Sequence, residues 1–125
     1  IVLTNTDWKV YLSRENNGDF EISRAGWIGD YQDPKTFLDM MVSGRGNNKT
    51  GWSNPEYDAL LVKASQATSQ AQRYAYLYEA EKILIDELPI IPIYTYTRIY
   101  MKHESVKGWS SNLLDSHPYQ YIDIE

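Results

Sequence analysis

The hydrophobic positions along the chain follow two periods. A spacing near 3.6 residues predicts an amphipathic helix, and it recurs in four segments: residues 6–17, 33–44, 54–64 and 69–87. Strict alternation predicts a half-buried strand, and it occurs in three segments: residues 20–23, 93–100 and 121–124. We therefore expect an α/β chain with the order helix, strand, three helices, strand, strand.

Capping signals set the expected helix starts. Thr6 is a candidate cap for the first helix, and Ser69 has capping-box spacing to Gln72. Asp33 and Asn54 each precede a proline, and a cap followed by proline begins a helix. The spacing predicts the following buried faces: Trp8, Tyr11 and Leu12; Phe37, Leu38 and Met41, before Gly44 ends the helix; Tyr57, Leu60, Leu61 and Ala64; and Tyr74, Leu77, Tyr78, Glu81, Leu84 and Ile85.

The predicted sheet is small for the helices that surround it. We expect the last two helices to form an antiparallel pair packed on this sheet, yet its two main strands lie about 70 residues apart. Pro89 and Pro92 restrict the second strand to an edge or a crossover at its start, because proline removes a ladder donor. A sheet of two or three strands is thin. Either another chain completes the sheet or partner strands are missing.

Composition and charge exclude several classes of function. The 125 residues are 42% hydrophobic and 23% charged, which suits one folded domain. The net charge of −5 and the scattered basic residues argue against nucleic acid as a partner. No apolar run approaches the roughly 18 residues of a membrane helix. The chain begins neither with Met nor with a signal peptide, so we expect it to be processed or cut from something longer.

Few residues offer metal or nucleophile chemistry. The chain has no cysteine, and His103 and His117 lack metal-ligand spacing, so neither a metal nor a cofactor is expected. Eleven tyrosines and four tryptophans suit a wet binding surface. Aromatic residues also line ordinary strands, so composition leaves both interpretations open.

The stretch RAGWIGDYQDP, residues 24–34, carries the candidate chemistry. Asp30 and Asp33 form a carboxylate pair, but Asp33 is accounted for as a helix cap and no serine, histidine or phosphate loop accompanies it. An enzyme is therefore not expected. Asp30 follows a glycine-containing bend at the end of a predicted strand, where α/β folds present ligand-binding groups. It suits a receptor for an ammonium group, although a solvated turn aspartate is an equal alternative.

The segment RAGWIGDYQDPKTFLDMM, residues 24–41, resembles the C-terminal lobe of oligopeptide-binding proteins, the extracytoplasmic solute receptors of peptide ABC importers. The likeness continues through WSNPEYDALLVKASQATSQAQRYAYLYEAEKILIDELPIIPIYTYTR, residues 52–98, and covers nearly the whole chain. It is carried most specifically by the Gly-Trp-x-x-Asp-Tyr-x-x-Pro cluster. The resemblance implies part of a class II periplasmic-binding-protein fold, whose two lobes close around an extended peptide.

The resemblance also implies site residues. The cluster's aspartate, Asp30, would hold the α-amino group of the peptide, and the backbone of Gly26 and Ile28 would pair with it like an added strand. The other implied ligand contacts are Trp27 and Trp8, as pocket walls, and Arg24 and Arg14, near the peptide carboxylate.

The same resemblance implies an organisation and partners. Residues 1–100 would form a segment of the C-terminal lobe, and residues 101–125 would cross back to the N-terminal lobe of the same receptor. The receptor would work outside the cytoplasm, in a periplasm or as a Gram-positive cell-surface lipoprotein, and would deliver short peptides to an ABC permease. A pheromone or signalling peptide, a nickel chelate or a sugar is the alternative ligand. A chain of this length alone is expected to expose apolar surface and to self-associate.

Overall fold

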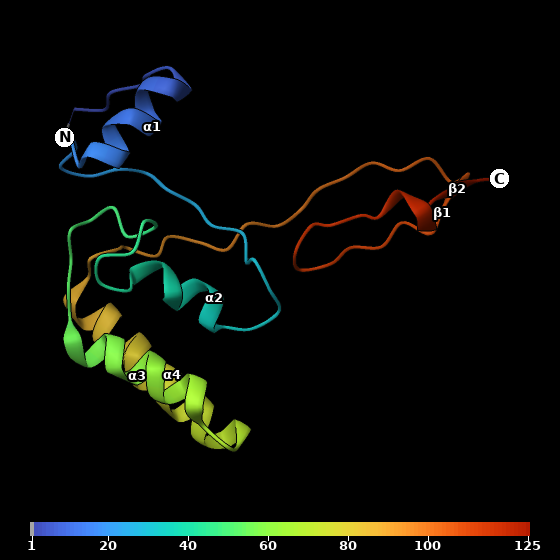
Figure 1. The fold of residues 1–125 in the computed structure, drawn as a ribbon. Helices are drawn as coiled ribbons and strands as arrows, with labels where there is room; N and C mark the ends of the chain where they lie inside the picture. The colour runs from blue at the N-terminus through green and yellow to red at the C-terminus, as the bar shows by residue number, and fades with distance from the viewer. Residues whose placement is uncertain (1) are drawn as a thin grey trace.

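Residues 2–125 are described by a computed structural model, in which most of the helices form a compact body and the C-terminal part forms an extended arm (Figure 1). The body contains α2 (Lys35–Leu38), the 3-10 helix η1 (Asp39–Met41), α3 (Pro55–Gln66) and α4 (Gln70–Glu87). The first helix, α1 (Trp8–Asn17), lies apart from this body. The arm carries β1 (Val106–Lys107), the 3-10 helix η2 (Tyr119–Tyr121) and β2 (Asp123–Ile124).

Helix α1 forms where the spacing predicts it, but with a different cap. The Asp7 carboxylate accepts a hydrogen bond from the Lys9 N–H at 2.9 Å, so the cap is Asp7 and not Thr6. Gly18 ends the helix in the left-handed conformation with φ 68°. None of its residues is buried, and Trp8 and Leu12 are exposed. The predicted buried face is wrong within the described residues because no other element covers it.

Helix α2 begins at the predicted place and is shorter than predicted. The Asp33 carboxylate accepts from the Lys35 N–H at 2.9 Å, while Pro34, predicted as the first helical residue, holds the N-cap position. The helix then tightens into η1, and Gly44 follows with φ 68°. Leu38 and Met41 are buried as expected, whereas Phe37 is 44% exposed. The buried positions of α2 and η1 are Thr36, Leu38 and Met41, so the 3.6-residue spacing misplaced Phe37.

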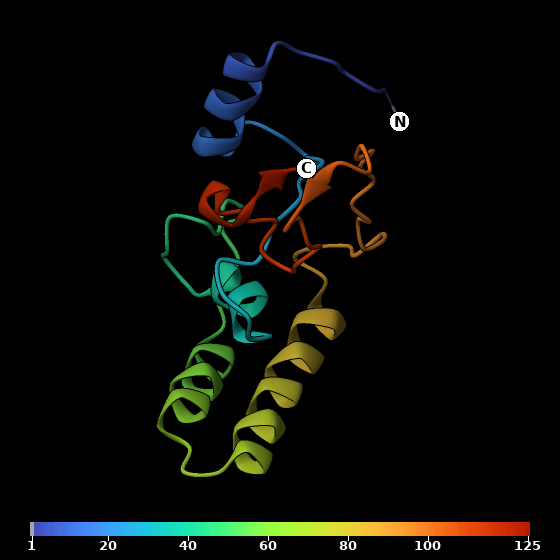
Figure 2. The ribbon, with the colours of Figure 1, turned by 90° about the vertical axis from the view of Figure 1, so that its right-hand side faces the viewer.

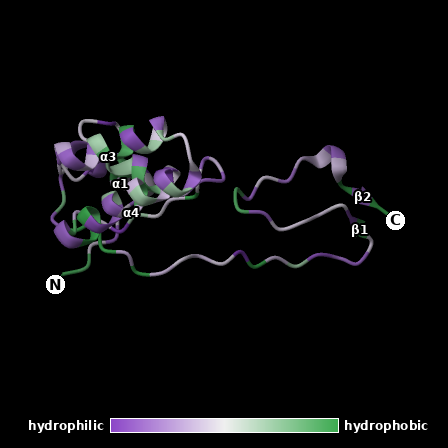
Figure 3. Ribbon diagram, turned by 90° about the horizontal axis from the view of Figure 1, so that it is seen from below, coloured by the Kyte–Doolittle hydropathy of each residue, from purple (hydrophilic) through white to green (hydrophobic). Residues whose placement is uncertain are grey.

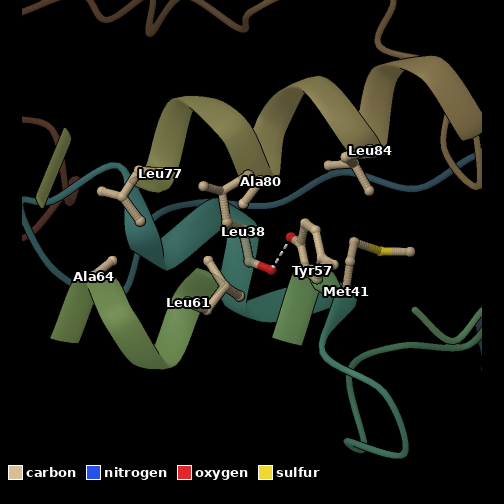
Figure 4. Packing of buried hydrophobic residues seen from close by; sticks show 8 residues of the cluster. All are labelled: Leu38, Met41, Tyr57, Leu61, Ala64, Leu77, Ala80 and Leu84. Carbon is tan, nitrogen blue, oxygen red and sulfur yellow. Dashed lines mark hydrogen bonds between the residues drawn. The ribbon is translucent and has the colours of Figure 1, made fainter. Parts of the chain in front are cut away.

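Helices α3 and α4 form an antiparallel hairpin that encloses the core (Figure 2). Both caps are confirmed: Asn54 accepts from the Glu56 and Tyr57 N–H groups, and Ser69 accepts from Gln72. Small side chains at the contact, Ala64 and Ala80, let the helices approach closely. The core residues, shown in Figure 4, are Leu38, Met41, Tyr57, Leu61, Ala64, Leu77, Ala80 and Leu84.

The predicted face of α4 is only half correct. Leu77 and Leu84 are buried, but Tyr74, Tyr78 and Ile85 are exposed. One neighbouring hairpin helix covers a narrow stripe of α4, and that stripe includes Ala80, which the apolar pattern did not single out. Tyr57 is fully buried and its hydroxyl donates to the Leu38 carbonyl at 2.6 Å (Figure 4). This bond connects α3 with α2.

The two main predicted strands do not form among the described residues. Residues 20–23 and 93–100 run without helix or strand pairing, and the hairpin helices do not pack on a sheet. The sheet that is present has two antiparallel strands, β1 and β2, with Val106 opposite Ile124. The predicted strand 121–124 is therefore confirmed only at its end. Alternation makes a segment ready for pairing, but a strand also requires a neighbour that completes its hydrogen-bond ladder.

The arm leaves the helical body as a long extended segment, along which hydrophobic and hydrophilic residues are mixed (Figure 3). It is folded back by the β1–β2 pairing and by a stack of Trp109 on His117, with ring centroids 3.7 Å apart. Among residues 2–125, no helix is both long enough and apolar enough to cross a bilayer.

Candidate functional site

Residues 24–30, here called the wall segment, are anchored at both ends and unpaired between them. At one end the Arg24 carbonyl accepts a hydrogen bond from the Tyr11 hydroxyl at 3.0 Å. At the other end the Asp30 N–H donates to Thr36 Oγ1 at 2.9 Å, and Thr36 is buried in α2. Within the described chain, the backbone of residues 25–29 makes no hydrogen bond. Residues 25–28 are exposed, so their backbone donors and acceptors are open to an added strand, whereas Gly29 is buried.

Tyr96 covers one face of the wall segment. The Arg24 guanidinium donates to the Tyr96 hydroxyl and lies over its ring, 5.8 Å from the centroid. A Cβ at Gly26 would lie 3.7 Å from the ring carbon Cε2 of Tyr96. Residues 24 and 26 thus face the same way, as extended geometry requires. By the same alternation Trp27 faces the opposite side, where its side chain is 37% exposed.

The two aspartates of the predicted pair have separate environments. The Asp33 carboxylate contacts the Lys35 N–H and the Arg73 guanidinium, the latter at 2.6 Å. Burial alone would raise the pKa of Asp33, but these hydrogen bonds and positive charges outweigh it and hold its pKa below the ordinary value. Asp30 is exposed, and no hydrogen bond or ion pair of residues 2–125 involves its carboxylate. Its charge is free to meet a ligand.

Tyr31, next to Asp30, is not a free group. Its hydroxyl donates to Asp39 at 2.8 Å, and Asp39 also pairs with Lys35 at 2.6 Å. Burial, together with the bond to Asp39, raises the pKa of Tyr31 to about 12. The phenol therefore remains a neutral donor at physiological pH.

Helix α1 reaches the wall segment through Tyr11, and one of its two predicted site residues, Trp8, contacts that tyrosine. The Trp8 ring stacks on Tyr11, with centroids 5.1 Å apart, and Tyr11 in turn bonds Arg24. Arg14 pairs with Asp19 at 3.3 Å, at the end of the same helix. No contact in the described residues joins Arg14 to the wall segment.

Sequence reasoning did not assign Tyr11 and Tyr96 to the site. The Tyr11 contact with Arg24 spans 13 positions and the Tyr96 contact spans 72. The helical spacing predicts a helix face for Tyr11 and the alternation predicts a strand face for Tyr96, and neither pattern indicates a contact with Arg24. A long-range contact leaves no local signal, although the tyrosine-rich composition pointed towards such a surface.

The wall segment thus presents together an open backbone edge, a carboxylate without a partner in residues 2–125, and the exposed Trp27. No cluster of metal-ligating side chains occurs in residues 2–125. No family model matches the chain.

Comparison with known proteins shows to which family the chain is similar. The chain is 36% identical over 125 residues to the dipeptide-binding protein DppE of Bacillus subtilis, covering 100% of this chain and 22% of that protein. It is 39% identical over 112 residues to the periplasmic murein peptide-binding protein MppA of Escherichia coli, covering 90% and 21%. The crystal structure of Haemophilus influenzae OppA in complex with the peptide RPPGFSPFR matches with a TM-score of 0.88 and 33% identity, covering 98% and 24%.

The chain therefore belongs to the oligopeptide- and dipeptide-binding proteins of the family 5 extracellular solute-binding proteins, and it spans about a fifth of the length of the curated relatives that it matches. The structural matches confirm the predicted fold class, part of a periplasmic-binding-protein fold. The homologous proteins are binding proteins, which agrees with the expected lack of enzymatic activity.

Proposed function

We propose that this chain forms one wall of the peptide site of an extracytoplasmic receptor that supplies short peptides to an ABC permease. The observation that carries the proposal is the wall segment, whose open backbone edge ends beside the unpaired carboxylate of Asp30. An extended peptide offers the complementary groups: main-chain donors and acceptors along its length and an ammonium at its start. The peptide-binding names of the relatives agree with this ligand.

Asp30 is the ammonium anchor in this proposal. Its backbone is fixed by the bond to buried Thr36, so its carboxylate projects from a defined position. A carboxylate that meets an ammonium in a closing, desolvated cleft gives a strong charge-assisted bond. The ammonium is common to peptides of every sequence, so this contact contributes affinity without selecting side chains.

The backbone of Gly26 and Ile28 then pairs with the peptide main chain, and the tryptophans receive its side chains. Trp27 and Trp8 are both exposed, in keeping with pockets that the ligand and a second lobe complete. Arg24 and Arg14 are proposed to approach the peptide carboxylate, in part through water. Each is occupied in this structure, Arg24 by Tyr96 and Arg14 by Asp19, so each exchanges a partner on binding.

The remaining organisation follows from the family. Residues 1–100 are assigned to the C-terminal lobe and residues 101–125 to the return into the N-terminal lobe, in keeping with the extended arm. The receptor is placed in a periplasm or on a cell surface, since MppA is named a periplasmic protein. Short peptides, the N-terminal lobe and the membrane permease are its proposed partners.

Calorimetry on the complete receptor that contains this chain tests the proposal. Asp30→Asn is expected to weaken the binding of peptides with a free amino terminus by more than about a hundredfold. Removing one partner of a desolvated charge pair costs roughly 3–5 kcal/mol. Peptides with an acetylated amino terminus should bind weakly to both proteins. Glu21→Gln, at an exposed neighbouring carboxylate, is the control and should bind like wild type.

Equal affinity of Asp30→Asn and wild type for free-amino peptides would exclude the anchoring role. A nickel chelate or a sugar that bound both proteins alike, with no peptide bound by either, would show that the receptor has another ligand.

A further inference from the structure

Tyr11 links α1 to the wall segment through its hydroxyl and its ring. The hydroxyl oxygen lies 3.0 Å from the Arg24 carbonyl and 2.8 Å from Glu15 Oε1, and the ring stacks on Trp8. The side chain is half-buried by these contacts. Tyr11 thus occupies the space beside one particular backbone group of the wall segment.

That backbone group belongs to the edge that a peptide would use. In an extended chain the N–H and C=O of one residue point to the same edge, and those of the next residue point to the opposite edge. The shared orientation of residues 24 and 26 towards Tyr96 shows this alternation in the wall segment. The Arg24 carbonyl therefore points to the same edge as the backbone groups of Gly26 and Ile28.

We propose that Tyr11 is a specificity-determining residue that ends main-chain pairing at Arg24. The inference rests on the proposed function, in which the peptide runs from Asp30 towards Arg24, antiparallel to the wall segment. Pairing is open at Ile28 and Gly26 and closed at Arg24, because the Tyr11 hydroxyl lies 3.0 Å from the Arg24 carbonyl oxygen, in the place that a peptide N–H would need. Beyond this point a peptide must turn away from the wall segment.

The spacing of hydrogen bonds in an antiparallel pair shows at which peptide residue the main-chain pairing ends. Hydrogen-bonded positions on one antiparallel edge recur every second residue. With the ammonium at Asp30 and the first peptide residue opposite Ile28, the third residue lies opposite Gly26 and the fifth opposite Arg24. Main-chain recognition therefore includes the third residue and omits the fifth.

Glu15 supplies a matched control. The phenol has one hydrogen for two acceptors, Glu15 and the Arg24 carbonyl. In Glu15→Gln the new amide can donate to the phenolic oxygen, which leaves the phenolic hydrogen to Arg24. This variant keeps the edge closed, whereas Tyr11→Phe keeps the ring and frees the carbonyl.

The experiment compares pentapeptides on the complete receptor by calorimetry. The probes are penta-alanine and its derivatives with an N-methyl group on the third or on the fifth residue, which removes one main-chain donor. In wild type and Glu15→Gln, methylation of the third residue is expected to weaken binding about two- to tenfold, the value of one hydrogen bond, and methylation of the fifth to leave it unchanged. In Tyr11→Phe, methylation of the fifth residue should also weaken binding by about two- to tenfold.

Wild-type affinity that fell on methylation of the fifth residue would overturn the inference without any variant. The inference would also be overturned if Tyr11→Phe lowered the affinity for all three pentapeptides by one common factor, because a merely structural residue has that effect. Wild-type receptor that bound none of these peptides would overturn the proposed function itself, and this inference with it.

Discussion

Asp33 Oδ1 and Arg73 Nη2 lie 2.6 Å apart and join the start of α2 to the first turn of α4. Arg73 also donates to the Ala64 carbonyl at 3.0 Å, so one guanidinium connects α2, α3 and α4. Thr36, the second residue of α2, then holds the backbone of Asp30. The candidate ammonium anchor is thus positioned by the helical body through a short series of hydrogen bonds.

Two substitutions at Asp33 separate its two roles. Asp33→Asn loses the charge and keeps an oxygen for the Lys35 N–H, so we expect it to destabilise α2 locally by about 1 kcal/mol. Asp33→Ala also loses the oxygen that accepts from the Lys35 N–H, and we expect about 1 kcal/mol more. Hydrogen exchange of the α2 amides in the complete receptor measures both. Arg14→Gln is the control, because its partner Asp19 is largely exposed and such pairs contribute little. Equal protection in all four proteins would contradict the prediction.

The same ion pair predicts a pH dependence. The pKa of Asp33 is held below its ordinary value of 3.8 in the folded protein. The ionised carboxylate therefore stabilises the folded state above that value, and the contribution is lost as the pH falls below 3.8 through the lower folded pKa. Protection of the α2 amides should decline in this window in wild type more steeply than in Asp33→Asn. Parallel profiles would show that another group governs the transition.

Removing the hydroxyl of Tyr57 from the core is expected to lower the free energy of unfolding. Its side chain is 0% exposed, and burial, with the charges of Asp39 and Asp58, raises its pKa, so the hydroxyl remains a donor to the Leu38 carbonyl. Tyr57→Phe leaves that carbonyl without this partner, and we expect a loss of about 1–3 kcal/mol in the free energy of unfolding. Tyr78→Phe, on the exposed face of α4, should stay within about 0.5 kcal/mol of wild type in denaturant unfolding.

Local signals predicted the helices well because caps act within a few residues. Asn54, Ser69 and Asp33 each place a side-chain oxygen beside backbone N–H groups two or three positions away, so spacing alone identifies them. The buried faces were less predictable. Tyr78 and Ile85 follow helical spacing as well as Leu77 and Leu84 do, and only the presence of α3 on one side decides which are covered.

The strands and the site depend on partners that no local pattern contains. Residues 93–100 alternate as a strand should, but a ladder requires a second chain segment at the correct distance. At the site, Asp30 was recognisable from its place after a bend and from the family's motif. The contribution of Tyr11 was not, because it depends on a helix returning to a carbonyl 13 residues later.

Gly108, which directly follows β1, lies very close to η2. Its φ is 75°, and a Cβ there would lie 1.7 Å from the Tyr121 carbonyl oxygen. Gly108→Ala must therefore separate these segments, and we expect it to destabilise the β1–β2 pairing by at least about 1 kcal/mol. Exchange of the Glu125 amide, which donates to the Ser105 carbonyl at 3.0 Å, reports on the pairing. Gly46→Ala, where a Cβ meets open space, should leave this amide protected as in wild type.

The exposed apolar side chains predict the behaviour of the 125-residue chain on its own. Ile93, Ile99 and Met101 are 79%, 92% and 101% exposed, on a segment whose backbone has no strand partner among residues 2–125. Burying them against a second copy would remove apolar surface from water and satisfy open edges, so we expect the isolated chain to self-associate. Sedimentation should show species larger than a monomer, and the double variant Ile93→Lys, Ile99→Lys should shift the distribution towards monomer, because a buried lysine charge opposes association. Glu21→Lys, a charge change on an exposed residue outside this segment, should leave the distribution unchanged. A wild-type chain that sedimented as a well-folded monomer would show that these side chains do not drive association.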